Sequence, residues 1–106
     1  MLQRHNTRLP GVAIGTVIGA SAEIPYGSYA SGMVYVPAGS SITTLTWHAA
    51  EKPGGTYLAA EDASSSAVTQ TVAASQAHPI PTALQGAQVI KATGNAVGTI
   101  DITMKS

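Results

Sequence analysis

Short runs of alternating apolar and polar residues, separated by glycine and proline turns, are the feature that most constrains the fold of this chain. From Gly32 onward these turns recur at roughly ten-residue intervals, and no amphipathic helix longer than a turn or two is visible. Alternation places one face of each strand in a core and the other in solvent. We therefore predict an all-β fold, an antiparallel β-sandwich of jelly-roll or Greek-key type.

The clearest alternation closes the chain, where Ile100, Ile102 and Met104 are predicted to point inward and Asp101 outward. Trp47 is predicted to anchor the core. One helical turn is expected after Pro81, with Thr82 as its cap. The predicted strands of this part are residues 33–36, 41–49, 56–60, 67–73, 77–81, 88–93 and 97–104.

The first part of the chain is punctuated differently, because glycines interrupt its apolar content. We predict an extended N-terminal arm over residues 1–31 and a sandwich domain over residues 32–106. An irregular strand, a loop packed on its own domain and a secretory signal are the alternatives for parts of this segment. The arm offers apolar and aromatic side chains for contact with other protein: Leu9, Val12, Ile14, Ile18, Ile24, Tyr26 and Tyr29.

Charged residues are scarce, at 9% of 106 residues, against roughly a quarter in ordinary domains. Residues 24–50 and 63–90 carry no formal charge. Binding to nucleic acid needs a basic stripe that this chain lacks, and no apolar run approaches the ~20 residues that span a bilayer. We predict a structural protein whose surface is occupied by other protein, with no enzymatic activity and no nucleic-acid or membrane partner.

The residue types that usually carry chemistry are spread along the chain. His5, His48 and His78 lack the spacing of zinc ligands. Glu61 and Asp62 precede three serines, but calcium loops generally use more carboxylates in a fixed register. We therefore predict no catalytic, cofactor-binding or metal-binding residues and no cofactor.

Two further polar side chains, Asp101 and Lys91, lie on neighbouring predicted strands and share an outward parity. A surface ion pair between them is the prediction. This interpretation assigns Asp101 a structural role rather than a place in a pair of catalytic carboxylates.

A family resemblance covers residues 31–105. It is carried by strand starts, turns and an aromatic hairpin: GMVYVPAGSSIT at 32–43, LTWHA at 45–49, PGGTY at 53–57, AVTQTV at 67–72 and GTIDI at 98–102. This succession resembles small β-sandwich proteins encoded among the structural genes of tailed bacteriophages and prophages. Some of these resemble capsid decoration, or cement, proteins.

The resemblance implies a virion protein of the capsid surface, made in the cytoplasm of a bacterial host. Its implied partners are the major capsid protein and neighbouring copies of itself, with a homotrimer favoured. A receptor- or carbohydrate-binding module of a phage tail or host surface is the alternative, with Tyr26 and Tyr29 as its stacking platform. A small bacterial sandwich of unrelated role is the third reading.

Overall fold

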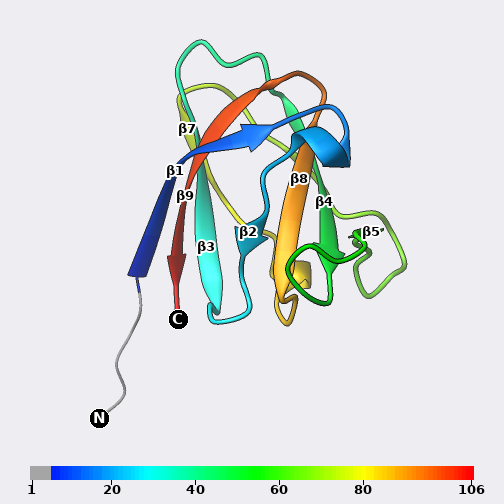
Figure 1. The fold of residues 1–106 in the computed structure, drawn as a ribbon. Coiled ribbons are helices and arrows are strands. Elements are labelled where there is room, and N and C mark those ends of the chain that lie inside the picture. Colours follow the sequence, from blue (N-terminus) through cyan, green and yellow to red (C-terminus); the bar gives the residue numbers. More distant parts are fainter. Residues whose placement is uncertain (1–5) are drawn as a thin grey trace.

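The computed structural model describes residues 6–106, which form two antiparallel sheets packed face to face (Figure 1). This arrangement confirms the predicted all-β antiparallel sandwich. Its strands are short because turns end each alternating run, and the two helical elements are single 3-10 turns. The elements are β1 (Asn6–Ile14), η1 (Ile18–Ala20), β2 (Ile24–Pro25), β3 (Ser31–Val36), β4 (Thr44–Ala50), β5 (Leu58–Ala59), β6 (Thr69–Thr71), β7 (Gln76–Pro79), η2 (Thr82–Leu84), β8 (Val89–Gly94) and β9 (Gly98–Lys105).

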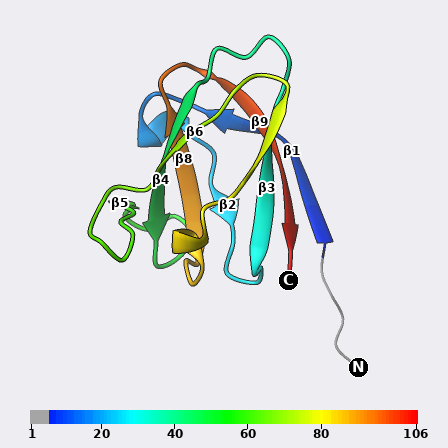
Figure 2. The ribbon, with the colours of Figure 1, turned by 180° about the vertical axis from the view of Figure 1, so that it is seen from behind.

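Strands from the two ends of the chain pair with each other. One sheet has the order β1-β9-β3-β7, and the other has the order β2-β8-β4-β5, with β6 also paired to β4. Figure 2 shows β6 and β7 from behind, where the chain passes from one sheet to the other. The first strand thus pairs with the last and the second with the next to last. This order favours the jelly-roll type, which stays a prediction.

The core lies between the two sheets and is built from inward-facing aliphatic side chains around one indole. Trp47 is fully buried, as predicted, and so are Ile100, Ile102 and Met104 on β9. The indole Nε1 of Trp47 donates a 3.2 Å hydrogen bond to Gln70 Oε1. Because a buried N–H without a partner would cost about 1–3 kcal/mol, this contact is part of what fixes the ring.

The N-terminal segment is not a separate arm, which corrects the expected division at residue 31. β1 pairs with β9 along its whole length, β2 pairs with β8, and both strands contribute buried residues to the common core. The pairing of β1 shifts register between Leu9 and Val12, where Gly11 adopts a φ of +64°. The glycine therefore marks a bulge within a strand rather than a break between modules. The first five residues of the expected arm lie outside the described residues.

Two local predictions are also wrong. Asp101 pairs with Arg8 on β1, at 3.6 Å, rather than with Lys91. The physical reason is that β8 and β9 belong to different sheets, so shared parity does not bring their side chains together. Thr82 is the first residue of η2 and does not cap it, since Pro81 occupies the cap position and makes no side-chain hydrogen bond.

Helices are too short here to cross a bilayer: none in residues 6–106 has the length and apolar content of a membrane span.

Candidate functional site

Four of the residues predicted to contact other protein are buried inside the sandwich. Val12 and Ile14 lie on the inner face of β1, and Ile24 and Tyr26 lie in and just after β2. Tyr26 is only 1% exposed, and its burial raises the pKa of its hydroxyl. These four residues stabilise this chain's own core and do not form a surface, which corrects their predicted role. The aromatic platform of the sugar-binding alternative loses Tyr26 for the same reason.

The other three predicted contact residues are half-buried. Leu9 and Tyr29 pack against the edge of the core, and Ile18 begins η1. The Tyr29 hydroxyl lies 2.5 Å from Thr7 Oγ1, in a contact that joins the β2–β3 connection to β1. The structure therefore does not gather the seven predicted contact residues into one patch.

Four other large apolar side chains face solvent within residues 6–106. Val97 is 76% exposed, Leu58 68%, Val17 60% and Tyr35 40%. A signal for Val97 was present in the sequence, because it shares the parity of the outward Thr99, Asp101 and Thr103. Val97 lies in the glycine-flanked turn between β8 and β9, outside both strands, and its side chain is therefore exposed.

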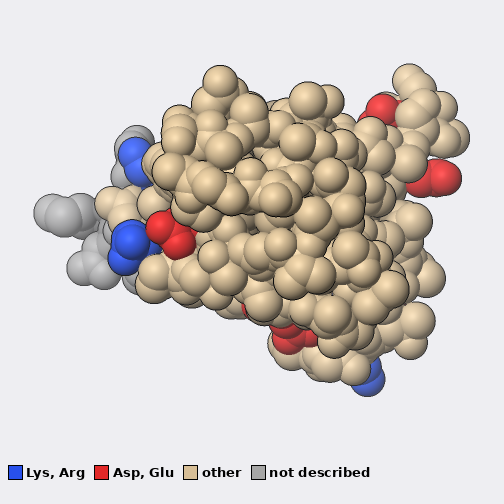
Figure 3. All heavy atoms as spheres, turned by 90° about the horizontal axis from the view of Figure 1, so that it is seen from above, with Lys and Arg blue, Asp and Glu red and all other residues tan. Residues whose placement is uncertain are grey.

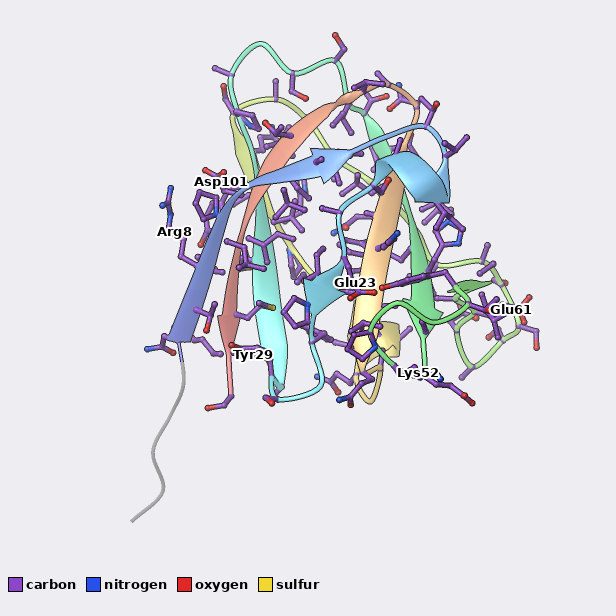
Figure 4. All side chains as sticks on the ribbon, viewed as in Figure 1. Arg8, Glu23, Tyr29, Lys52, Glu61 and Asp101 are labelled. Atoms are coloured by element: carbon purple, nitrogen blue, oxygen red, sulfur yellow. The ribbon has the colours of Figure 1, made fainter. Side chains whose placement is uncertain are left out.

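The charged groups are scattered over the sides and one end of the molecule. Figure 4 shows Arg8 and Asp101 beside β1, whereas Glu61 and Lys52 lie on the far side of the fold. The Arg8–Asp101 pair is open to solvent, with side chains 65% and 42% exposed. Such exposed pairs contribute about 0–1 kcal/mol. Asp101 also accepts a 2.8 Å hydrogen bond from the Gly11 amide, so it supports the bulge in β1.

Histidines and acidic residues hold structural positions. His78 Nε2 accepts a 3.3 Å bond from the Ala73 amide, and Asp62 Oδ1 accepts bonds from the Ser64 and Ser66 amides. The Asp62 carboxylate thus organises its own loop. Within residues 6–106, no group of three or more His, Cys, Asp and Glu side chains is placed to hold a metal ion. His5 lies outside the described residues.

His48 lies on the outer face of β4. Its Nε2 is 3.4 Å from Thr93 Oγ1, and its Nδ1 is buried without a hydrogen-bond partner among the described residues. Burial lowers the pKa of His48. In register, His48 stands opposite Lys91 of β8, so a neutral imidazole also avoids a second positive charge there.

A polar cluster that joins distant parts of the chain lies on the outer face of the β2-β8-β4-β5 sheet. Tyr57 donates a 2.5 Å hydrogen bond to Glu23 Oε2, and the Gly54 amide donates a 3.0 Å bond to the same oxygen. Lys91 Nζ sits 4.8 Å from the centroid of the Tyr57 ring and donates to the Ile18 carbonyl. The cluster ties the β4–β5 loop to the segment before β2.

These contacts move two titrations in opposite directions. The Tyr57 hydroxyl, followed by the Gly54 amide, holds the pKa of Glu23 below its ordinary 4.5. Burial, followed by the bond to Glu23, raises the pKa of Tyr57 well above its ordinary 10.0. Because the folded-state pKa of Glu23 is depressed, its stabilising effect is present above pH 4.5 and is lost as the pH falls through the folded-state value.

We expect Tyr57→Phe to raise the pKa of Glu23 toward 4.5. The phenyl ring keeps the cover over Lys91 but loses the donor to the carboxylate. An NMR titration of the Glu23 carboxyl carbon measures the midpoint. The difference in unfolding free energy between wild type and variant should shrink as the pH falls below 4.5. The reason is that a protonated Glu23 carboxyl gains less from the Tyr57 hydrogen bond than the carboxylate does.

Tyr35→Phe is the matched control, because the Tyr35 hydroxyl bonds only to a surface hydroxyl, Thr103 Oγ1, at 3.3 Å. It should leave the Glu23 titration unchanged. An equal Glu23 midpoint in wild type and Tyr57→Phe would contradict the assignment.

An open groove of about 860 Å³ lies beside this cluster. Its walls come from the β4–β5 loop and from residues 86–88, and small side chains such as Ala49, Ala60 and Ala87 line it. The two charged side chains at its rim are Glu51 and Lys52. The groove offers apolar contact area and backbone, but its described lining does not place an acid, a base and a nucleophile in bonding range of one another.

Comparison of the chain with protein-family models, with curated proteins and with solved structures gives no match.

Proposed function

We propose that this chain is a virion structural protein: a capsid decoration, or cement, protein that binds the assembled shell and stabilises it through contacts between subunits. In this proposal it has no catalytic role and needs no cofactor. It is made in the host cytoplasm and resides on the capsid surface. Its partners are the major capsid protein and copies of itself, with a homotrimer favoured.

One observation carries the proposal: the described surface is almost free of charge and yet belongs to a complete, well-packed sandwich. Seen along the long direction of the strands, the face in Figure 3 is uncharged at its centre, with charged atoms only at its rim. A free small domain generally relies on surface charge for solubility. A surface that is covered by other protein does not need that charge, and it has few ions to desolvate on contact.

The physical role follows from mass action. A protein that binds the assembled shell and not its separated subunits stabilises the assembled form. When the contact is repeated over a closed lattice, weak individual interfaces add up through multivalency.

Lateral contacts between copies have suitable surfaces on the sides of the sandwich. β1 and β7 end one sheet, and β2 and the β5–β6 side end the other. Edge strands present unpaired backbone groups that other chains can pair with. Tyr35 adds an exposed aromatic ring on the outer face of the β1-β9-β3-β7 sheet, away from its edges.

Binding to shells tests the proposal. Shells assembled from the major capsid protein of the virus that encodes this chain are sedimented with increasing amounts of the purified protein. We expect saturable co-sedimentation at a fixed ratio of chain to capsid protein, and extra density on the shell by electron microscopy. Mass photometry of the isolated chain should show trimers. Absence of saturable binding to the shells would refute the proposed function.

A further inference from the structure

Four connections of the fold meet at one end of the sandwich. They join β1 to η1, β3 to β4, β6 to β7, and β8 to β9, and they form the upper end of the molecule in Figure 1. We call this surface the loop end, defined as residues 15–20, 37–43, 72–75 and 94–98. The other end holds the C-terminus, the β4–β5 loop and η2 (Figure 1).

The loop end has no charged residue in any of its four segments. Viewed directly, its centre is free of charged atoms (Figure 3). It also presents Val97 and Val17, which are among the most exposed large apolar side chains of the described residues. Lys91 approaches it from the side, where the Ile18 carbonyl and the Tyr57 ring engage its ammonium. The opposite end, by contrast, includes Glu51, Lys52 and Lys105.

Side-chain and backbone hydrogen bonds hold the segments of the loop end to one another. Asn95 Oδ1 accepts from the amides of Thr43 and Thr44, at 2.8 and 3.1 Å, and so joins the β8–β9 turn to the β3–β4 connection. The Gly94 amide donates to the Gly15 carbonyl, which joins the same turn to the first connection.

Two serines complete this bracing. Ser21 Oγ accepts from the Gly15 amide and donates to the Val17 carbonyl, and Ser40 Oγ accepts from the Ile42 amide. Backbone groups that would otherwise need water are thus satisfied within the chain. Another protein that covers this end therefore does not have to pair these backbone groups, and loops joined by such bonds have less conformational entropy to lose on binding.

The loop end also contains a shallow hollow of about 270 Å³ next to Val97, lined by residues 37–41 and 97–99. Small residues line the hollow, among them Ala38, Gly39 and Gly98. Ser40, Ser41 and Thr99 also line it, so that its exposed surface is more polar than apolar. A projecting valine beside a hollow of this size gives an interlocking surface, which can receive one side chain of a partner while Val97 enters the partner's surface.

From these observations we infer that the loop end is the surface that seats on the shell, against an uncharged, apolar patch of the major capsid protein. This inference rests on the function proposed above. In the proposed assembly, copies meet through the edges of their sheets, which leaves the two ends of each sandwich to face the shell and the solvent. The charged end suits water, and the uncharged, braced end suits protein.

Substitution of single exposed aliphatic residues by aspartate tests the assignment, since each places one charge on a chosen surface. Val97→Asp marks the loop end. Leu58→Asp is the matched control, because Leu58 is similarly exposed but lines the groove at the other end. Thermal unfolding followed by circular dichroism verifies that both variants fold. We expect Val97→Asp to weaken binding to the shells at least ~10-fold, which corresponds to ~1.4 kcal/mol, and Leu58→Asp to change it by less than ~2-fold.

Each outcome decides the question. If wild type and Val97→Asp bind the shells equally well, the loop end is not the surface that contacts the shell, while the proposed function stands. A loss confined to Leu58→Asp would place the contact at the groove and overturn the inference in the same way. If Val97→Asp dissociates an oligomer of the isolated chain, seen by mass photometry, the occupant is a second copy rather than the shell. If wild type itself fails to bind, the inference falls together with the proposed function.

Discussion

Deletion of residues 1–15 is expected to abolish folding of this protein, rather than to remove a detachable binding arm. The deletion takes away the whole of β1, which pairs with β9 from Asn6 to Ile14. It also removes Val12 and Ile14 from the core. The truncated chain should lose the cooperative thermal transition and show the red-shifted emission of a solvent-exposed Trp47.

The size of the effect follows from what β1 buries. Val12 and Ile14 are 7% and 1% exposed, and burial of each aliphatic side chain contributes about 1.5–3 kcal/mol. Their removal also uncovers the β9 residues that they protect and leaves the β9 backbone without a partner on that side. Small domains are stable by only about 5–15 kcal/mol in total, so this loss is comparable with the whole.

Deletion of residues 1–5 is the control, because it leaves β1 intact and should preserve the melting transition. The comparison separates the two interpretations of the N-terminal segment. Retention of a cooperative transition after removal of residues 1–15 would contradict the pairing of β1 with β9 in the same chain. It would restore the interpretation of the segment as an arm that finds its partner elsewhere.

The N-terminal segment also marks the limit of what the sequence could reveal. Alternation and turns from Gly32 onward located the later strands, although β5 and β6 are shorter than predicted. The period of two is clearest in β9, where buried and less buried residues alternate. β1 does not keep that period, since the bulge at Gly11 shifts the register between Leu9 and Val12. A strand with an extra residue resembles a loop in the sequence, and no pattern indicates whether it pairs within its own chain or with another.

The surface was harder to predict than the core for a related reason. Parity indicates which side of a strand faces inward, and it placed Trp47, Ile100 and Ile102 correctly. It does not indicate which sheet a strand joins, and so it paired Asp101 with Lys91 rather than Arg8. The loop end is assembled from four connections that are distant in sequence, and only the fold brings them together.

Trp47→Ala is expected to produce the largest loss of stability of any single substitution in the core. Trp47 is fully buried and is the largest of the buried side chains, and truncation of a buried tryptophan typically costs about 3–5 kcal/mol. For a domain of this size, the loss corresponds to a fall in the melting temperature on the order of 20 °C. Circular dichroism is the appropriate measurement, because the variant has no tryptophan to report by fluorescence.

The contribution of the indole N–H is separable from that of the ring. Trp47→Phe keeps most of the apolar volume but leaves Gln70 Oε1 without its donor, at an expected cost of about 1–2 kcal/mol. Gln70 Nε2 also donates to the Pro79 carbonyl at 2.6 Å, so this amide joins Trp47 in one sheet to β7 in the other. In a double-mutant cycle, Trp47→Phe and Gln70→Ala should therefore show a coupling energy of about 0.5–1.5 kcal/mol.

Gln85→Ala provides the matched control for this cycle. Its side-chain amide also bonds to a backbone carbonyl, that of Ala30 at 2.8 Å, but it does not touch Trp47. The effects of Trp47→Phe and Gln85→Ala should add within ~0.5 kcal/mol. Additivity of Trp47→Phe with Gln70→Ala as well would show that the Gln70 amide contributes no link between the sheets, and that Trp47 stabilises the sandwich through the volume of its ring alone.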